Sequence, residues 1–152
     1  MTLTLPVGSI LYLDTSNTDT PTWVKLSEHN RSPVSLDTQR IERSQRMANG
    51  SLRKIFIADK KNISTSWSML PSYSTMTVDA GYGAADLKSF YHGKGTGSFK
   101  VKISYNGVSG RDEILTAVFT SCSFTVVKRN VKSNMADVAQ EFWDVSISLE
   151  EV

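Results

Sequence analysis

The sequence is poor in the residues from which most catalytic and metal sites are built. Its 152 residues include one cysteine, Cys122, and two histidines, His29 and His92. A single cysteine excludes an intrachain disulfide and a thiolate cluster for zinc, so we interpret Cys122 as a small buried strand residue. Two imidazoles leave almost no material for a metal site or for a nucleophile with its base. We therefore expect no enzyme activity, no metal and no cofactor.

Long apolar runs and a strong net charge are also missing. The apolar runs are short, as at residues 10–13, whereas a membrane-spanning helix needs about 20 apolar residues. Lys and Arg number 17 against 15 Asp and Glu, a formal net charge of +2, which does not identify a nucleic-acid binder or a membrane-surface protein. Residues 1–8 have no basic region before an apolar block, so we expect no secretory signal and synthesis in the cytosol. We predict no membrane partner and no small-molecule substrate.

Serine and threonine are abundant, with 21 Ser and 14 Thr, and several stretches alternate between polar and apolar residues. Period-two alternation predicts antiparallel strands that pack on a core from one side. Residues 113–128 are apolar on both faces for much of their length and are predicted to form the most central strand. The predicted core-facing positions are Val34 and Leu36; Ile63, Thr65, Trp67 and Met69; Phe99, Val101, Ile103 and Tyr105; and Trp143, Val145, Ile147 and Leu149.

Turn and helix signals separate these strands. Asn49-Gly50 and Asn106-Gly107 supply the positive backbone angles of tight hairpin turns, so two hairpins are expected. Between residues 83 and 93, apolar residues such as Leu87 recur every three to four positions, which predicts one short helix whose end is Gly93 in the left-handed conformation. The sequence thus predicts a single domain over residues 1–152. Its fold class is mainly β, an antiparallel β-sandwich or barrel with one short flanking α-helix.

Three segments are interpreted as connections. The glycine-rich tract at residues 93–98 superficially suggests a phosphate cradle, but it leaves a helix and enters a strand, the reverse of a phosphate-binding loop. Residues 15–21 and 130–140 lack periodicity and are predicted to be loops.

Residues 40–61 contain seven of the 17 cations against only two acids, Glu42 and Asp59, which predicts an extended basic hairpin at about residues 38–60. Three interpretations stay open: a solvated charged hairpin, an arm that docks on an acidic surface of another subunit, and a nucleic-acid contact. The last lacks the repeated exposed aromatics of a stacking platform. Residues 145–152 are interpreted as a strand whose carboxylates meet such arms between copies. The candidate inter-subunit residues are Arg40, Arg43, Arg46, Met47, Asn49, Gly50, Arg53, Lys54, Glu150 and Glu151.

Four stretches together resemble small tail-associated structural proteins of long-tailed bacteriophages. They are residues 40–54 (RIERSQRMANGSLRK), 57–60 (IADK), 67–72 (WSMLPS) and 142–152 (FWDVSISLEEV). The resemblance implies a tail-tube-like fold, a β-sandwich with a flanking helix, assembled as hexameric rings whose sheets join into a continuous inner barrel. Stacked rings then form a channel through which DNA passes without sequence-specific binding. In such proteins a long loop or hairpin and the chain ends connect one ring to the next.

The resemblance also sets the expected function, partners and location. We expect a structural subunit of the virion tail that forms homo-oligomeric rings and contacts other tail or virion proteins. Tube channels in such proteins tend to be acidic, and the sequence alone shows no clearly acidic strand face. One alternative is a capsid decoration, neck or collar protein. A second is a module that binds host-surface glycans through exposed aromatics such as Trp23 and Tyr73.

Overall fold

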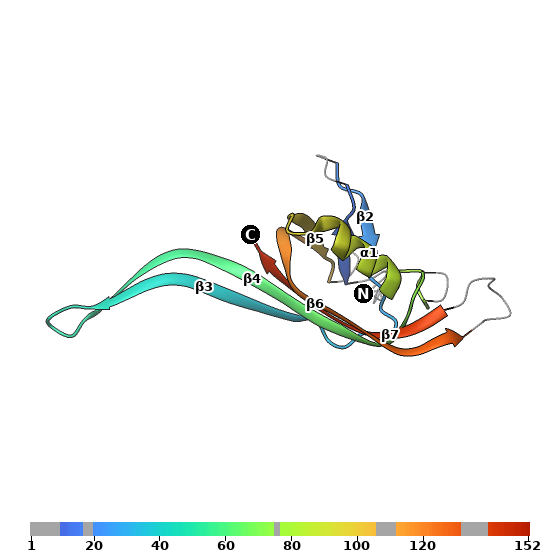
Figure 1. Cartoon of the computed structure of the whole chain (residues 1–152). Helices are drawn as coiled ribbons and strands as arrows, with labels where there is room; N and C mark the ends of the chain where they lie inside the picture. Colours follow the sequence, from blue (N-terminus) through green and yellow to red (C-terminus); the bar gives the residue numbers. More distant parts are fainter. Residues whose placement is uncertain (1–9, 17–19, 75–76, 106–111, 132–139) are drawn as a thin grey trace, which may run out of the picture.

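The computed structural model describes residues 10–16, 20–74, 77–105, 112–131 and 140–152. Within these residues it has seven strands and one helix (Figure 1). The elements are β1 (Leu11–Asp14), β2 (Trp23–Lys25), β3 (Ser35–Arg46), β4 (Leu52–Pro71), α1 (Ala84–Lys94), β5 (Phe99–Ile103), β6 (Glu113–Val131) and β7 (Gln140–Glu151). The predicted fold class, mainly β and antiparallel with one short helix, is confirmed.

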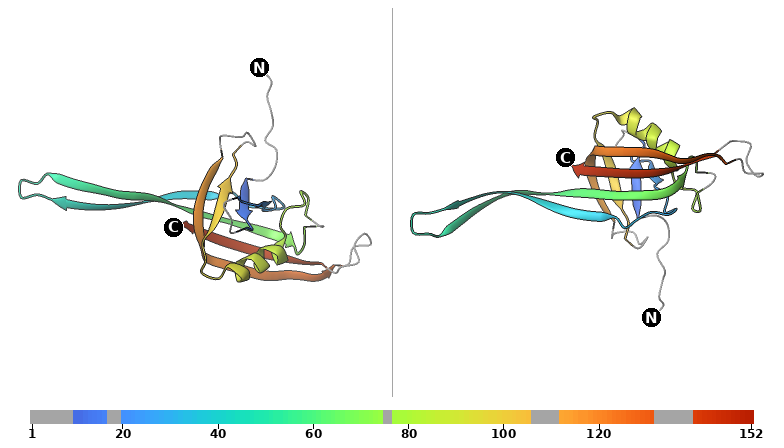
Figure 2. Two further views of the ribbon diagram at one scale, coloured as in Figure 1. Left: turned by 90° about the horizontal axis from the view of Figure 1, so that it is seen from above. Right: turned by 60° about the horizontal axis from the view of Figure 1, so that its bottom comes forward.

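All strands belong to one antiparallel sheet in the order β2-β1-β5-β6-β7-β4-β3. The strand predicted to be most central, β6, is the fourth of the seven, and its neighbours are the strands before and after it in the sequence. Figure 2 shows that β1 and β5 run across the direction of β4 and β7. The sheet therefore bends around its inner face, and this bend creates the core.

The core consists of the inward residues of the sheet together with one face of the helix. Alternating positions of β4, β5 and β7 are buried, as the sequence pattern predicts. Phe90 of α1 packs edge-on against Phe99 and Phe119, with ring centroids 5.1 and 6.0 Å apart. The largest fully buried side chains are Leu11, Leu13, Leu26, Ile63, Leu70, Leu87, Ile103, Ile147, Leu149, Val101 and Val145.

The start of α1 depends on a close backbone approach at Gly83. A Cβ atom at this position would lie 2.6 Å from the carbonyl oxygens of both Pro71 and Ser72. The Gly83 amide donates to Oδ2 of Asp86 at 3.2 Å, which satisfies one of the unpaired amides at the helix N-terminus. Glycine is therefore required where β4 ends and α1 begins.

The left-handed residue that follows the helix lies two positions later than predicted. Gly93, expected in the left-handed conformation, lies inside α1, and the residue with φ of 55° is Gly95. The tract at residues 93–98 does connect α1 to β5, as predicted. Glycines alternate at positions 93, 95 and 97, so the sequence contains more than one residue able to end the helix.

Two predicted core positions are wrong. The alternation along β4 stops after Trp67, because the register with β7 shifts between Trp67 and Leu70 and Met69 has φ of 54°. This bulge places Leu70, rather than Met69, in the core. Tyr105 follows the end of β5 and is exposed, with its hydroxyl donating to Glu113 at 2.9 Å.

The predicted connections are reproduced where the structure describes them. The Asn49-Gly50 turn joins β3 and β4, and Gly50 has φ of 87°. The Asn106-Gly107 turn lies outside the described residues, although the strands on either side of it, β5 and β6, do pair. Of the predicted loop at residues 15–21, only residues 15, 16, 20 and 21 are described, and they lie outside the strands and the helix. The loop predicted at residues 130–140 is too long, because β6 continues to Val131 and β7 begins at Gln140.

Candidate assembly surfaces

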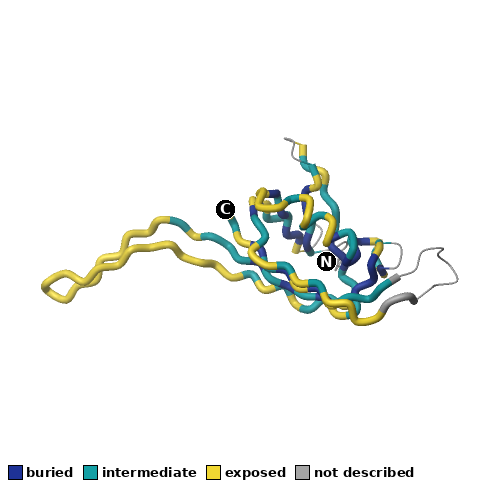
Figure 3. Tube along the Cα trace, in the orientation of Figure 1, coloured by how far each residue is buried: buried dark blue, intermediate teal, exposed yellow. Residues whose placement is uncertain are grey.

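The most prominent surface is the distal part of the β3–β4 hairpin, residues 38–61, which we call the arm. β4 pairs with β7 only from Asn62 onward, so between Leu52 and Lys61 its only strand partner in the described structure is β3. The arm extends away from the rest of the molecule, the body (Figures 1 and 2). Every residue from 38 to 57 is exposed (Figure 3). The arm is therefore a two-stranded ribbon that packs against no other described residues, an arrangement that is at best marginally stable in water.

The tip of the arm is a tight turn held by local hydrogen bonds. The Met47 amide donates to the Ser51 carbonyl at 2.8 Å, and the Gly50 amide donates to the Met47 carbonyl at 2.9 Å. Arg46 donates through Nη1 to the Gly50 carbonyl at 2.9 Å, and the Asn49 side chain accepts from the Ser51 amide at 3.0 Å. Four of the candidate residues, at positions 46, 47, 49 and 50, thus build the turn itself.

A β-bulge determines which side chains share a face of the arm. Ile41 pairs with Ala58, whereas the next residue, Glu42, pairs with Phe56, so Ile57 has no partner in the register. Paired residues share a face, and successive residues of a strand alternate. The arm consequently has two different faces. The first, the paired-charge face, carries Arg40, Glu42, Arg46, Leu52, Lys54, Phe56 and Asp59. The second, the arginine–isoleucine face, carries Ile41, Arg43, Gln45, Arg53 and Ile55.

Four of the five charged residues on the paired-charge face neutralise one another in pairs. Arg40 donates to both oxygens of Asp59, at 2.9 and 3.2 Å, and its guanidinium carbon lies 5.7 Å from the ring centroid of Phe56. The hydrogen bond from Arg40 lowers the pKa of Asp59, and the same bond raises the pKa of Arg40. The ammonium of Lys54 lies 3.4 Å from Glu42. Two of the three cations on this face are therefore in ion pairs, and the third, Arg46, donates to the Gly50 carbonyl.

The arginine–isoleucine face has no such compensation. No carboxylate of the described part of the chain lies within 4.0 Å of the guanidinium of Arg43 or Arg53. Ile55, which pairs with Arg43, is 65% exposed, and Ile41 is 41% exposed. An exposed apolar pair flanked by two arginines has the composition of an interface core rather than that of a solvated hairpin.

The base of the arm is joined to the body by a polar network. Lys61 donates through Nζ to Glu113 at 2.7 Å and through its amide to Glu151 at 2.9 Å. The bond to Glu113 raises the pKa of Lys61, and bonds from Lys61 and Tyr105 lower the pKa of Glu113. Glu151, a candidate for contacts between copies, thus contacts the arm base of its own chain, and its role between subunits stays a prediction.

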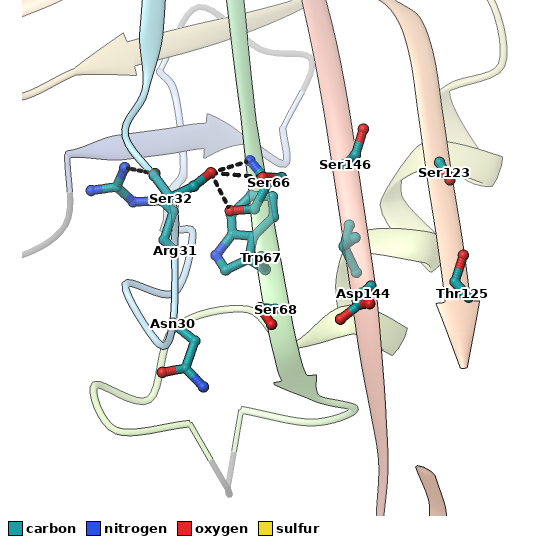
Figure 4. Close-up of a pocket in the computed structure, with 11 residues that line it drawn as sticks. Asn30, Arg31, Ser32, Ser66, Trp67, Ser68, Ser123, Thr125, Asp144 and Ser146 are labelled. Atoms are coloured by element: carbon teal, nitrogen blue, oxygen red, sulfur yellow. Dashed lines mark hydrogen bonds between the residues drawn. The ribbon is translucent and has the colours of Figure 1, made fainter. Parts of the chain in front are cut away.

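A second surface is the outward face of the sheet over β4, β6 and β7, which we call the serine face. Ser64 and Ser121 both pair with Ser148, and Ser66 and Ser123 both pair with Ser146. A pocket on this face is bounded by the segment at residues 30–32, where Ser32 lies 2.7 Å from the Ser66 hydroxyl (Figure 4). The sequence alternation indicated the serines correctly.

Carboxylates gather on the serine face from strands that are distant in the sequence. Asp37 and Glu150 both pair with Asn62, so they lie on either side of it, and Asp144 pairs with Thr125. The neighbouring cations are engaged elsewhere: Arg31 forms an ion pair with Glu28, and Lys60 donates to the Val152 carbonyl at 2.7 Å. Carboxylates of β3 and β7 therefore share one face of the sheet on either side of β4, which the sequence did not reveal.

The described residues contain no cluster of three or more His, Cys, Asp or Glu that could hold a metal ion. Cys122 is half-buried on β6, and burial raises the pKa of its thiol to about 11, so it stays protonated at neutral pH. The aromatics considered for glycan binding lie on different elements: Trp23 on edge strand β2, with the Lys102 ammonium 5.1 Å from its ring, and Tyr73 after β4. No helix of the described part is long and apolar enough to cross a membrane.

The candidate residues divide into two groups in space. Those between positions 40 and 54 lie together on the arm, but the two faces separate Arg40 and Lys54 from Arg43 and Arg53. Glu150 and Glu151 lie at the end of β7, beside the arm base. Sequence reasoning missed Ile41, Ile55, Asp37 and Asp144, because only the register places them. No protein-family model and no curated protein matches this chain.

Proposed function

We propose that this protein is a structural subunit of a bacteriophage tail, which self-assembles into hexameric, stacked rings that form the tube for DNA passage. The observation that carries the proposal is the arm: a long, exposed ribbon with apolar side chains and no packing partner among the residues that the structure describes. A monomer gains nothing from such an element, whereas an assembly can cover it.

The edges of the sheet support self-association. β2 and β3 are the outermost strands, and within the described residues each pairs with only one neighbour. Unpaired strand edges are templates for pairing with another chain. Copies that join at these edges would extend the sheet and remove its margins.

The serine face supports the channel. It is rich in hydroxyl groups and carries Asp37, Asp144 and Glu150. Hydroxyls keep such a surface hydrated, and carboxylates repel phosphates, so DNA would pass along it without adhering.

Electron cryo-microscopy of the concentrated purified protein tests the proposal. Sixfold rings or stacked tubes with the serine face toward the lumen are expected. Particles with capsid symmetry would favour the decoration alternative. A protein that stays a compact monomer at every concentration, both alone and with the other tail proteins, would contradict self-assembly.

A further inference from the structure

We infer that the arm binds a second copy of this chain through one face only, the arginine–isoleucine face. Arg43 and Arg53 meet carboxylates on the body of the other copy, and Ile41 and Ile55 pack between them. The inference rests on the proposed self-assembly and specifies which residues of the arm make the contact.

Charge separates the two faces of the arm. Arg40 and Lys54 already have carboxylate partners, at 2.9 and 3.4 Å, so recruiting them to an interface would break existing pairs. Arg43 and Arg53 have no ion-pair partner among the described residues, so an external carboxylate adds an interaction without removing one. The high cation count of the arm therefore overstates its binding charge, because two of its seven cations form ion pairs with the two acids of the arm.

The apolar residues point to the same face. Ile41 lies on the same side of the ribbon as Ile55, and both are exposed. On the opposite side, Phe56 is 60% exposed, but the cation over its ring is Arg40, which is already in an ion pair with Asp59. Two arginines without ion pairs in the described structure thus occur beside exposed isoleucines on the arginine–isoleucine face, whereas the opposite face has one such arginine, Arg46.

The chain itself supplies the complementary partner. The arm contains seven cations and two acids, a charge of +5, and the rest of the chain has 17 − 7 = 10 cations and 15 − 2 = 13 acids, a charge of −3. Because the arm extends away from its own body (Figure 1), the negative surface it can reach belongs to another copy. Body carboxylates with no ion-pair partner in the described part include Asp37, Asp86, Glu141, Asp144 and Glu150.

Two matched double variants test the choice of face. R43Q/R53Q and R40Q/K54Q each remove two positive charges, one from each strand of the arm. We expect R43Q/R53Q to raise the protein concentration needed for assembly by about tenfold or more, as loss of interface arginines typically does, and R40Q/K54Q to change it little. Circular dichroism should show both variants folded. The inference would be overturned if both variants weakened assembly equally, or if neither variant weakened it.

A photo-crosslinking residue in place of Ile55 or Phe56 separates this inference from the proposed function. Crosslinked dimers are expected from position 55 and not from position 56. Rings without a crosslink at position 55 would overturn the inference and leave the proposed function standing. A crosslink at position 55 without rings or tubes would support the inference and contradict the tail-tube function. Failure of the wild-type protein to assemble, together with no crosslink from position 55, would overturn both.

Discussion

At the scale of single residues, Gly83 shows most directly how backbone packing constrains the sequence. Its α-hydrogen faces the carbonyl oxygens at the end of β4, and a methyl group there would lie 2.6 Å from two backbone atoms. We predict that Gly83→Ala lowers the free energy of unfolding by about 1–3 kcal/mol, because neither β4 nor α1 can move without disturbing the core. Urea denaturation followed by circular dichroism measures this change.

Gly93→Ala is the control for that prediction. A Cβ atom at Gly93 would have no neighbour within 4 Å, and the residue lies inside α1. Alanine there should stabilise the protein by about 0.5–1 kcal/mol, since it restricts the unfolded chain and favours the helix. A Gly83→Ala variant as stable as the wild type would contradict the close approach of α1 to β4.

Sequence reasoning could find the helix but not the different demands on its glycines. The three-to-four residue spacing identified the buried face that includes Leu87. The spacing could not show that Gly83 has room for a hydrogen atom but not for a methyl group, whereas Gly95 is required to adopt a positive φ. The first requirement depends on a strand that precedes the helix by more than ten residues, and the second on where the last helical turn stops.

At the scale of elements, the arm was the most predictable part of the molecule and also the part whose chemistry was hardest to predict. The Asn49-Gly50 turn and the strands beside it follow from local signals. The bulge between Ile41 and Glu42 has no such signal, yet it decides which residues share a face. A count of cations along the sequence therefore groups Arg40 with Arg43, although one is paired within the hairpin and the other is not.

Because the arm contributes no fully buried side chain, we predict that the body folds without it. Gln39 and Lys60 are cross-strand partners, so residues 40–59 can be replaced by an Asn-Gly turn that preserves the register. The shortened protein should unfold cooperatively, with a free energy of unfolding within about 1 kcal/mol of the wild type. It should remain monomeric at concentrations where the full chain assembles.

Denaturation and light scattering measure these two properties of the shortened protein separately. Loss of cooperative unfolding would mean that the arm stabilises the body, against the exposure of its side chains. Assembly at wild-type concentrations would mean that the arm is not an assembly element. The wild-type chain at the same concentration is the reference for both measurements.

At the scale of the whole molecule, the distribution of charge could not be predicted from sequence alone. Asp37 and Glu150 are 113 positions apart in the sequence, and only the pairing of β3, β4 and β7 brings them to either side of Asn62. The near-neutral net charge thus conceals a positive arm and a carboxylate-bearing sheet face. This separation gives copies of the chain a reason to associate in a defined orientation.

The same separation predicts how assembly responds to salt. Raising NaCl from 0.1 to 1 M shortens the screening length from about 10 to about 3 Å, which weakens attraction between exposed charges. Wild-type protein and R40Q/K54Q should therefore need a higher concentration to assemble in 1 M NaCl. R43Q/R53Q should be nearly insensitive, because its arm has lost the charges that act between copies. Light scattering at matched concentrations gives the comparison. Assembly of the wild type that strengthens with salt would mean that Ile41 and Ile55, rather than the arginines, dominate the contact.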